Sequence, residues 1–163
     1  MRYDGEHPQE VSYVAEMPDG FGTIEVRALH GMVTGISFGG EPTQGRPPEG
    51  MDNIIGQLRG YFRGQLTSFD LKLSMPPGFT GDVMGAMSRI PYGQTVSYSE
   101  LAKAVGRPGA ARAVGNVCAR NPLAVIIPCH RVVRADGSIG GFAGGSRMKE
   151  RMLALERETV ISR

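Results

Sequence analysis

The sequence has no tryptophan, two cysteines and three histidines, and it contains no apolar run of about 18 residues that would suggest a membrane span. Two cysteines are too few for a disulfide framework, and with three scattered histidines they form no zinc-binding pattern. The first 17 residues are polar and acidic, unlike a secretory signal peptide. These absences predict a cytoplasmic protein with no membrane partner, no metal and no cofactor.

Charge is distributed unevenly along the chain. Residues 1–77 carry 6 Lys/Arg and 10 Asp/Glu, whereas residues 78–163 carry 12 and 6. An acidic half joined to a basic half indicates that the second half meets a polyanion, although chance asymmetry is the alternative.

A Pro- and Gly-containing stretch at residues 74–78 divides the chain, because neither a helix nor a central strand continues through it. We expect an N-terminal α/β domain with an antiparallel sheet at residues 1–75. A mostly helical C-terminal domain is expected at residues 79–163. The predicted fold class is therefore α+β (α/β).

In the first half, alternating and helical patterns predict three strands and one helix, and no catalytic cluster is visible. His30-Gly31 predicts a hairpin turn between two of the strands. The expected elements are strands at residues 23–28, 32–38 and 69–73 and a helix at 54–62.

In the second half, Ser97 and Glu100 predict a capping box that opens a short helix. A turn at residues 106–109 leads into a second short helix, so the pair forms a helix-turn-helix candidate. Helix hairpins that bind no DNA are much commoner. However, residues 97–134 contain six basic residues and one acidic residue, and this excess of positive charge favours a nucleic-acid partner.

Cys129 and His130 are adjacent, directly after Pro128. A free thiol titrates near 8.5, and a neighbouring imidazole commonly increases its thiolate fraction. A buried structural cysteine beside an incidental histidine is the alternative. An accessible Cys-His pair needs a third group to orient the imidazole. We expect Glu156 to supply it, from a helix that begins near Ser146, with a solvated surface charge as the alternative.

The second half resembles the O6-alkylguanine-DNA alkyltransferases, also called methylated-DNA–protein-cysteine methyltransferases. The resemblance is carried in order by residues 90–98, 110–115, 121–122, 127–132 and 144–145 and by the last helix to Glu156. The first half agrees more loosely, chiefly at residues 61–64 and 69–71.

The resemblance implies DNA repair in which an O6-alkylated guanine leaves the duplex and its alkyl group moves irreversibly to Cys129, once per molecule. O4-alkylthymine is a second candidate lesion. The implied catalytic roles are attack by Cys129 and removal of its proton by His130 through a water, with His130 oriented by Glu156. Tyr98 contacts the flipped base and neutralises charge on it.

The resemblance also implies the DNA-binding and pocket residues. Arg112 inserts into the base stack, and small neighbours keep its helix slim enough for the minor groove. Asn121 is the hinge that ties this helix to the cysteine loop. The further expected DNA-binding residues are Ala111, Ala113, Gly115, Ser97 and Arg120; the expected pocket residues are Asn121, Cys118, Val132, Phe142 and Ala143.

Three departures from the family pattern are visible. Phe142 stands where most members carry a tyrosine, Cys118 replaces an apolar residue, and residues 80–84 lack the usual aromatics. The N-terminal half has no cysteine, so the structural zinc of some members is not expected. The expected partner is double-stranded DNA that contains alkylated guanine, bound by a monomer; the sequence leaves open whether monomers cluster along DNA.

Two rival functions remain at this stage. Alkyltransferase-like lesion sensors share the fold and bind the same bases, but they lack the cysteine that stands here at position 129. A cysteine hydrolase that uses Cys129, His130 and Glu156 is the other, although it would need an oxyanion hole and an open cleft.

Overall fold

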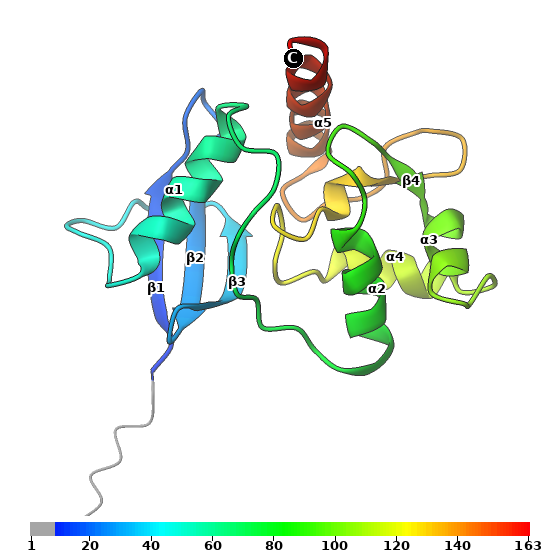
Figure 1. Ribbon diagram of the computed structural model, residues 1–163, viewed down its shortest axis with the longest axis horizontal. Helices are drawn as coiled ribbons and strands as arrows, with labels where there is room; N and C mark the ends of the chain where they lie inside the picture. The colour runs from blue at the N-terminus through cyan, green and yellow to red at the C-terminus, as the bar shows by residue number, and fades with distance from the viewer. Residues whose placement is uncertain (1–8) are drawn as a thin grey trace, which may run out of the picture.

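The computed structural model describes residues 9–163 and shows a mixed helix and sheet fold, which confirms the expected class (Figure 1). Residues 1–8 lie outside the described residues. They belong to the first 17 residues, whose composition is unlike that of a signal peptide. The elements in order are β1 (Val11–Glu16), β2 (Thr23–Leu29), β3 (Met32–Phe38), α1 (Met51–Phe62), α2 (Gly78–Ser88), β4 (Val96–Ser97), α3 (Tyr98–Ala104), α4 (Ala111–Ala119), the 3-10 helix η1 (Cys129–Arg131), β5 (Val132–Val133) and α5 (Ser146–Ile161).

The first three strands form an antiparallel sheet in the order β1-β2-β3. Every second side chain of β2 is buried, as alternation requires when one face of a strand meets the core. His30 (φ 49°) and Gly31 (φ 77°) are both left-handed, as in the two-residue turns that match the twist of a hairpin. The predicted hairpin between β2 and β3 is therefore confirmed.

Strand β1 was not expected from the sequence. It pairs with β2 from Val11↔Ala28 to Glu16↔Thr23, and Ala15 is its one buried side chain. An edge strand with so little buried apolar surface carries a weak alternation signal. Its partner strand, rather than its own sequence, therefore decides its conformation.

The strand expected at residues 69–73 is wrong. This segment has only one isolated bridge, between Leu73 and Val33. Asp70 instead has both backbone groups bound by the Gln57 side chain of α1: its N–H donates to Oε1 (2.9 Å), and its carbonyl accepts from Nε2 (3.1 Å). The Gln57 amide therefore makes the hydrogen bonds to Asp70 that a neighbouring strand would otherwise make.

The second half contains the predicted helix pair. Ser97 Oγ accepts from the Glu100 N–H (3.0 Å) and Glu100 Oε2 accepts from the Ser97 N–H (2.9 Å), so the capping box that opens α3 is confirmed. Helices α3 and α4 pack together through a short turn. The parallel pairing of β4 with β5, Val96↔Val132, places the start of α3 beside the cysteine segment.

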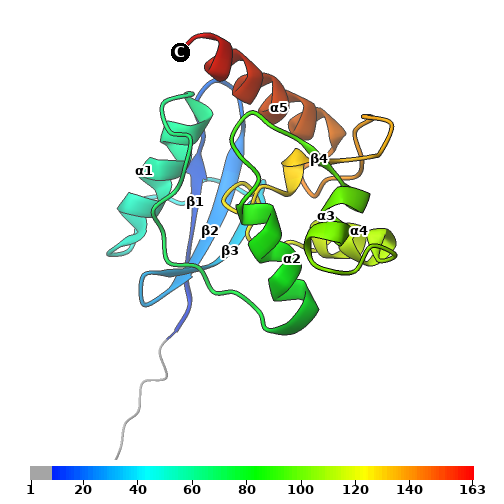
Figure 2. The same ribbon diagram turned by 45° about the vertical axis from the view of Figure 1, so that its right-hand side comes forward.

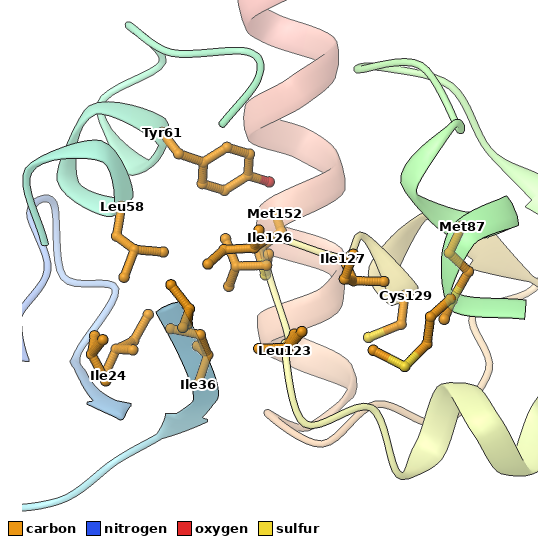
Figure 3. Packing of buried hydrophobic residues seen from close by; sticks show 14 of the residues in the cluster. Ile24, Ile36, Leu58, Tyr61, Met87, Leu123, Ile126, Ile127, Cys129 and Met152 are labelled. Atoms are coloured by element: carbon orange, nitrogen blue, oxygen red, sulfur yellow. The ribbon is translucent and has the colours of Figure 1, made fainter. Parts of the chain in front are cut away.

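One apolar core runs through both halves. In Figure 3, Leu123 and Ile126 lie between Ile24 and Ile36 of the sheet on one side and Met87 of α2 on the other. The Ile36 N–H donates to the carbonyl of residue 122 (2.8 Å), so the sheet also holds the cysteine segment through its backbone. Division into two domains near residue 76 stays a prediction.

Helix α5 lies against both halves of the chain. Figure 2 shows it lying across one end of the molecule, above both the sheet and α3. A Cβ on Gly64, just after α1, would lie 2.8 Å from Thr159 Oγ1, so the ends of α1 and α5 are in close contact. None of the described helices is both long and apolar enough to cross a membrane.

Candidate functional site

The Cys-His pair lies on a short buried turn. Cys129 is 3% exposed and His130 is fully buried, so the expectation of an accessible pair is wrong. The chain reaches the turn through Val125, which is buried with φ 73°. A left-handed β-branched residue costs about 1–3 kcal/mol and persists only where its surroundings enforce it. The packing of residues 123–128 therefore fixes the position of the thiol.

Glu156 lies beneath this turn, fully buried, and its carboxylate accepts four hydrogen bonds. Oε2 lies 2.5 Å from His130 Nε2 and accepts from the Tyr61 hydroxyl at 2.6 Å. Oε1 accepts from Arg131 Nε at 2.8 Å and from the Gly93 N–H at 2.9 Å. A solvated Glu156 is thereby excluded.

The protonation of this carboxylate follows from its partners. Burial alone would raise the pKa of Glu156, but its hydrogen bonds and its attraction to His130 and Arg131 outweigh burial and lower the pKa to about 2. Glu156 is therefore ionised at neutral pH, and all four of its contacts must be donors.

His130 is neutral in this setting. Burial lowers its pKa from the usual value, although Glu156 opposes that shift. Nε2 lies against the Glu156 carboxylate, so it carries the proton. Nδ1 has no hydrogen-bond partner among residues 9–163 and keeps its lone pair. His130 is therefore poised as a base through Nδ1.

The Cys129 thiol does not have the lowered pKa that an adjacent imidazolium would give. Burial raises its pKa, while the nearby Asn121 side chain and the positive charge of Lys149 act in the opposite direction. The side chain of Cys129 is thus a protonated thiol at rest. It needs a base at the moment of reaction rather than a standing thiolate.

Lys149 is a cation that lowers the pKa of the Cys129 thiol, and the sequence did not predict this role. It is fully buried in α5, donates to the Val132 carbonyl (2.6 Å), and forms no ion pair within residues 9–163. Burial lowers its pKa. The spacing of seven residues to Glu156 was the available signal, because it places both side chains on one helix face.

Tyr98, the first residue of α3, lies near both cysteines, with its ring centroid 6.0 Å from Lys149 Nζ. Burial raises its pKa, with further contributions from Cys118 and Cys129, so the hydroxyl stays a donor. A Cβ on Gly140 would lie 2.3 Å from the Tyr98 hydroxyl. Only glycine allows the loop after β5 to approach this closely.

The expected pocket residues have different surroundings. Asn121 donates from Nδ2 to the Ile127 carbonyl and accepts from the Leu123 N–H, both at 2.9 Å, so it braces the segment that leads to Cys129. Cys118 is buried 3.5 Å from the Met87 sulfur, and burial together with Cys129 raises its pKa to about 12. Val132 is buried in β5 and accepts the Lys149 hydrogen bond.

The loop residues lie further out. Phe142 packs edge-on against Phe38 of β3 (5.4 Å between centroids) and lies 6.4 Å from the His130 ring. Ala143 is exposed in the same loop.

The expected DNA-binding residues lie on α4 and at its C-terminal cap, except for Ser97, which precedes α3. Val114 and Cys118 face the core, whereas Arg112, Ala113 and Arg120 are exposed. Ala111 and Gly115 are half-buried, and a Cβ on Gly115 would lie 3.9 Å from the Tyr98 ring. Ser97 is occupied by the capping box. The exposed face of α4 is therefore slim, with two arginines.

The first half contributes more than expected. Tyr61 of α1 reaches Glu156 and His130, although residues 1–75 showed no catalytic cluster in the sequence. Arg131 was also missed; it binds Glu156 and donates from Nη1 to the Ile90 carbonyl (2.8 Å). No group of three or more His, Cys, Asp or Glu is placed to hold a metal ion among the described residues.

Comparison with known proteins identifies the family. Residues 78–158 match the family described as 6-O-methylguanine DNA methyltransferase, DNA binding domain. The methylated-DNA–protein-cysteine methyltransferase of Mycolicibacterium paratuberculosis is 46% identical over 111 residues, which cover 68% of this chain and 67% of the relative.

Solved structures from Mycobacterium tuberculosis are similar over most of the chain. An O6-methylguanine methyltransferase gives a TM-score of 0.82 at 34% identity and covers 92% of this chain and 94% of its own. OGT in complex with DNA gives 0.81 at 37% identity, over 91% and 93%.

Proposed function

Since the chain belongs to the 6-O-methylguanine DNA methyltransferase family, and is therefore a DNA-repair enzyme that transfers a methyl group from DNA to a protein cysteine, we propose that Cys129 is the acceptor and that each molecule acts once. The proposed substrate is O6-alkylguanine in double-stranded DNA, with O4-alkylthymine as a second candidate lesion. The observation that carries the proposal is the His130–Glu156 pair directly behind Cys129.

The burial of Cys129 supports base extrusion. A stacked base cannot approach a thiol that is 3% exposed, so the damaged nucleotide must leave the duplex, at a cost of a few kcal/mol. Arg112 is the exposed long side chain of the slim helix α4 and is proposed to fill the vacated place in the stack, from the minor groove. Ala111, Ala113 and Gly115 permit the close approach, and Ser97 and Arg120 flank it.

The proposed chemistry begins with the proton of the thiol. His130 Nδ1 takes it through a water, and the ionised Glu156 stabilises the imidazolium that forms. The sulfur attacks the alkyl carbon as the bond from that carbon to O6 breaks. The electron pair passes to guanine, which takes a proton at N1 from the Tyr98 hydroxyl; Tyr98 then regains a proton from the imidazolium of His130 through water, so that the thiol proton balances the one on guanine.

The product explains a single turnover. Cys129 becomes a thioether, which is a poor electrophile, and no second nucleophile in the site is able to remove the alkyl group. Cys118 has a pKa of about 12 and is therefore a neutral thiol at neutral pH. In this proposal Cys118 lines the alkyl pocket with Asn121, Val132, Phe142 and Ala143 and does not accept the alkyl group.

One experiment tests the acceptor and the stoichiometry together. The protein is incubated with one equivalent of duplex that carries O6-methylguanine, and the intact protein and its peptides are weighed. We expect one added methyl group per molecule, on the peptide that contains Cys129, and none in Cys129→Ser. A methyl group on Cys118, or several turnovers per molecule, contradicts the proposal.

The same experiment separates the rival functions. A lesion sensor would bind the duplex with no gain in mass, and a hydrolase would turn over an ester or amide repeatedly. The sequence difference that favours transfer is the thiol at position 129. The protein is proposed to act as a monomer.

A further inference from the structure

Tyr61 is a buried hydroxyl that the proposed reaction does not use. It lies at the end of α1, in the N-terminal layer formed by β1, β2, β3 and α1, and it is fully buried. Figure 3 shows its ring directed from α1 toward α5. Its hydroxyl lies 2.6 Å from Glu156 Oε2 and 3.2 Å from His130 Nε2.

The direction of these hydrogen bonds is fixed. Glu156 is ionised and only accepts, so the Tyr61 hydrogen points to Oε2. The Tyr61 oxygen can then offer only a lone pair to His130 Nε2. Nε2 therefore faces two acceptors, the carboxylate and the phenol oxygen, and must carry the imidazole proton.

We infer that Tyr61 is a positioning residue: its hydroxyl keeps His130 in the tautomer whose Nδ1 is unprotonated, and it makes the transfer reaction depend on the N-terminal layer. This inference rests on the proposed role of His130 as the base for Cys129. The hydroxyl also donates a hydrogen bond that stabilises the negative charge of Glu156. This bond limits how strongly the carboxylate favours a second proton on His130.

The other groups around His130 do not replace this contact. Arg131 lies beside it in η1 and Lys149 faces it from α5; both are cations and disfavour the imidazolium. The Glu156 carboxylate favours it. Burial raises the pKa of Tyr61 well above the usual value, so the hydroxyl remains a donor while His130 titrates.

Tyr61→Phe tests the inference, because it removes the hydroxyl and keeps the ring. The carboxylate then has one donor fewer and favours the imidazolium more, so the His130 pKa rises. Because the base must be neutral, we expect the acid limb of the single-turnover rate to move to higher pH, by on the order of one unit. The rate on the alkaline plateau should fall as well, because part of His130 then adopts the tautomer with a protonated Nδ1, which does not act as the base.

Tyr92→Phe is the matched control. The Tyr92 ring packs edge-on against Tyr61 at 6.1 Å, and its buried hydroxyl has no partner within residues 9–163. Its pH profile should overlay that of wild type. If Tyr61→Phe also overlays wild type, or lowers the rate equally at every pH, the hydroxyl only packs and the inference is overturned.

A second measurement needs no activity. Imidazole ¹⁵N NMR of the wild-type protein should show His130 with a protonated Nε2 and an unprotonated Nδ1, and in Tyr61→Phe it should titrate at higher pH. The opposite tautomer in wild type, or an unshifted titration, contradicts the role of Tyr61. Wild-type protein that takes up no methyl group instead contradicts the proposed function, so the two failures are distinguishable.

Discussion

The buried cluster around Glu156 and the exposed face of α4 are built in opposite ways. The cluster draws one donor from α1, two from η1 and one from the Gly93 turn, and the Glu156 carboxylate of α5 accepts all four. On α4, Arg112 is exposed and forms no side-chain hydrogen bond to the rest of residues 9–163. Proton transfer needs fixed geometry, whereas a side chain that replaces a base must be free until DNA arrives.

The largest expected effect is at Glu156. Glu156→Gln removes the charge and places an amide N–H₂ against two of the four donors, and breaking a buried ion pair typically costs about 3–5 kcal/mol. We expect alkyl transfer to fall by at least about a hundredfold with both duplex and free-base substrates. Single-turnover kinetics and thermal melting measure the two losses. Wild-type rates in this variant would remove Glu156 from the mechanism.

The same residue predicts a pH dependence of stability. The pKa of Glu156 is about 2 in the folded protein, below the usual 4.5, so its ionised form favours folding. Its contribution is complete above pH 4.5 and is lost as the pH falls toward 2. Urea unfolding between these limits should show a shallower decline of stability in Glu156→Gln than in wild type. Parallel declines would contradict the lowered pKa.

Arg112→Ala should separate the two regions. We expect repair of duplex DNA to slow by about ten- to hundredfold, because extrusion costs a few kcal/mol. Reaction with the free alkylated base should stay within about twofold. Arg120→Ala, at the C-terminal cap of the same helix, is a control for lost charge. Equal slowing on duplex and free base would move Arg112 out of base extrusion.

Lys149→Met sharpens the electrostatic side of the comparison. Lys149 lowers the pKa of the thiol at Cys129 against the effect of burial, so its removal should raise that pKa, by about one unit. The pH at which iodoacetamide reaches half its maximal rate measures the shift. Lys103→Met, on α3, is the control. An unchanged profile would leave Lys149 with only its hydrogen bond to Val132.

The smallest effect is expected at Phe142. Its ring packs against Phe38 and lies near His130, and Tyr98 already supplies a hydroxyl. Phe142→Tyr should therefore change the single-turnover rate by less than about fivefold, under ~1 kcal/mol. Phe142→Ala should weaken it far more. A large acceleration by tyrosine would show that this chain lacks a working contact.

Local rules account for the parts that the sequence predicted well. The hairpin at His30-Gly31 and the capping box at Ser97 are fixed by residues a few positions apart. The strand expected at residues 69–73 is wrong because Gln57, on another element, binds the backbone there. Edge strand β1 depends on its partner in the same way.

The site residues also divide into those that local sequence predicts and those that depend on distant contacts. Cys129 and His130 are neighbours, and a known motif marks them. Tyr61 lies 95 residues from Glu156, and no periodicity in the sequence connects the two. The burial that raises the Cys129 pKa and lowers the His130 pKa is likewise a property of the packed core. The sequence therefore predicts which residue types form the site, but it does not predict their protonation states.

The ratio of the duplex rate to the free-base rate tests the central claim most directly, namely that the buried cluster performs the chemistry and α4 provides access. It is measured in wild type, Glu156→Gln and Arg112→Ala under single-turnover conditions. The account predicts that Glu156→Gln lowers both rates and leaves their ratio unchanged within about twofold, while Arg112→Ala lowers the ratio by about tenfold or more. A ratio that changes in Glu156→Gln, or stays constant in Arg112→Ala, would contradict it.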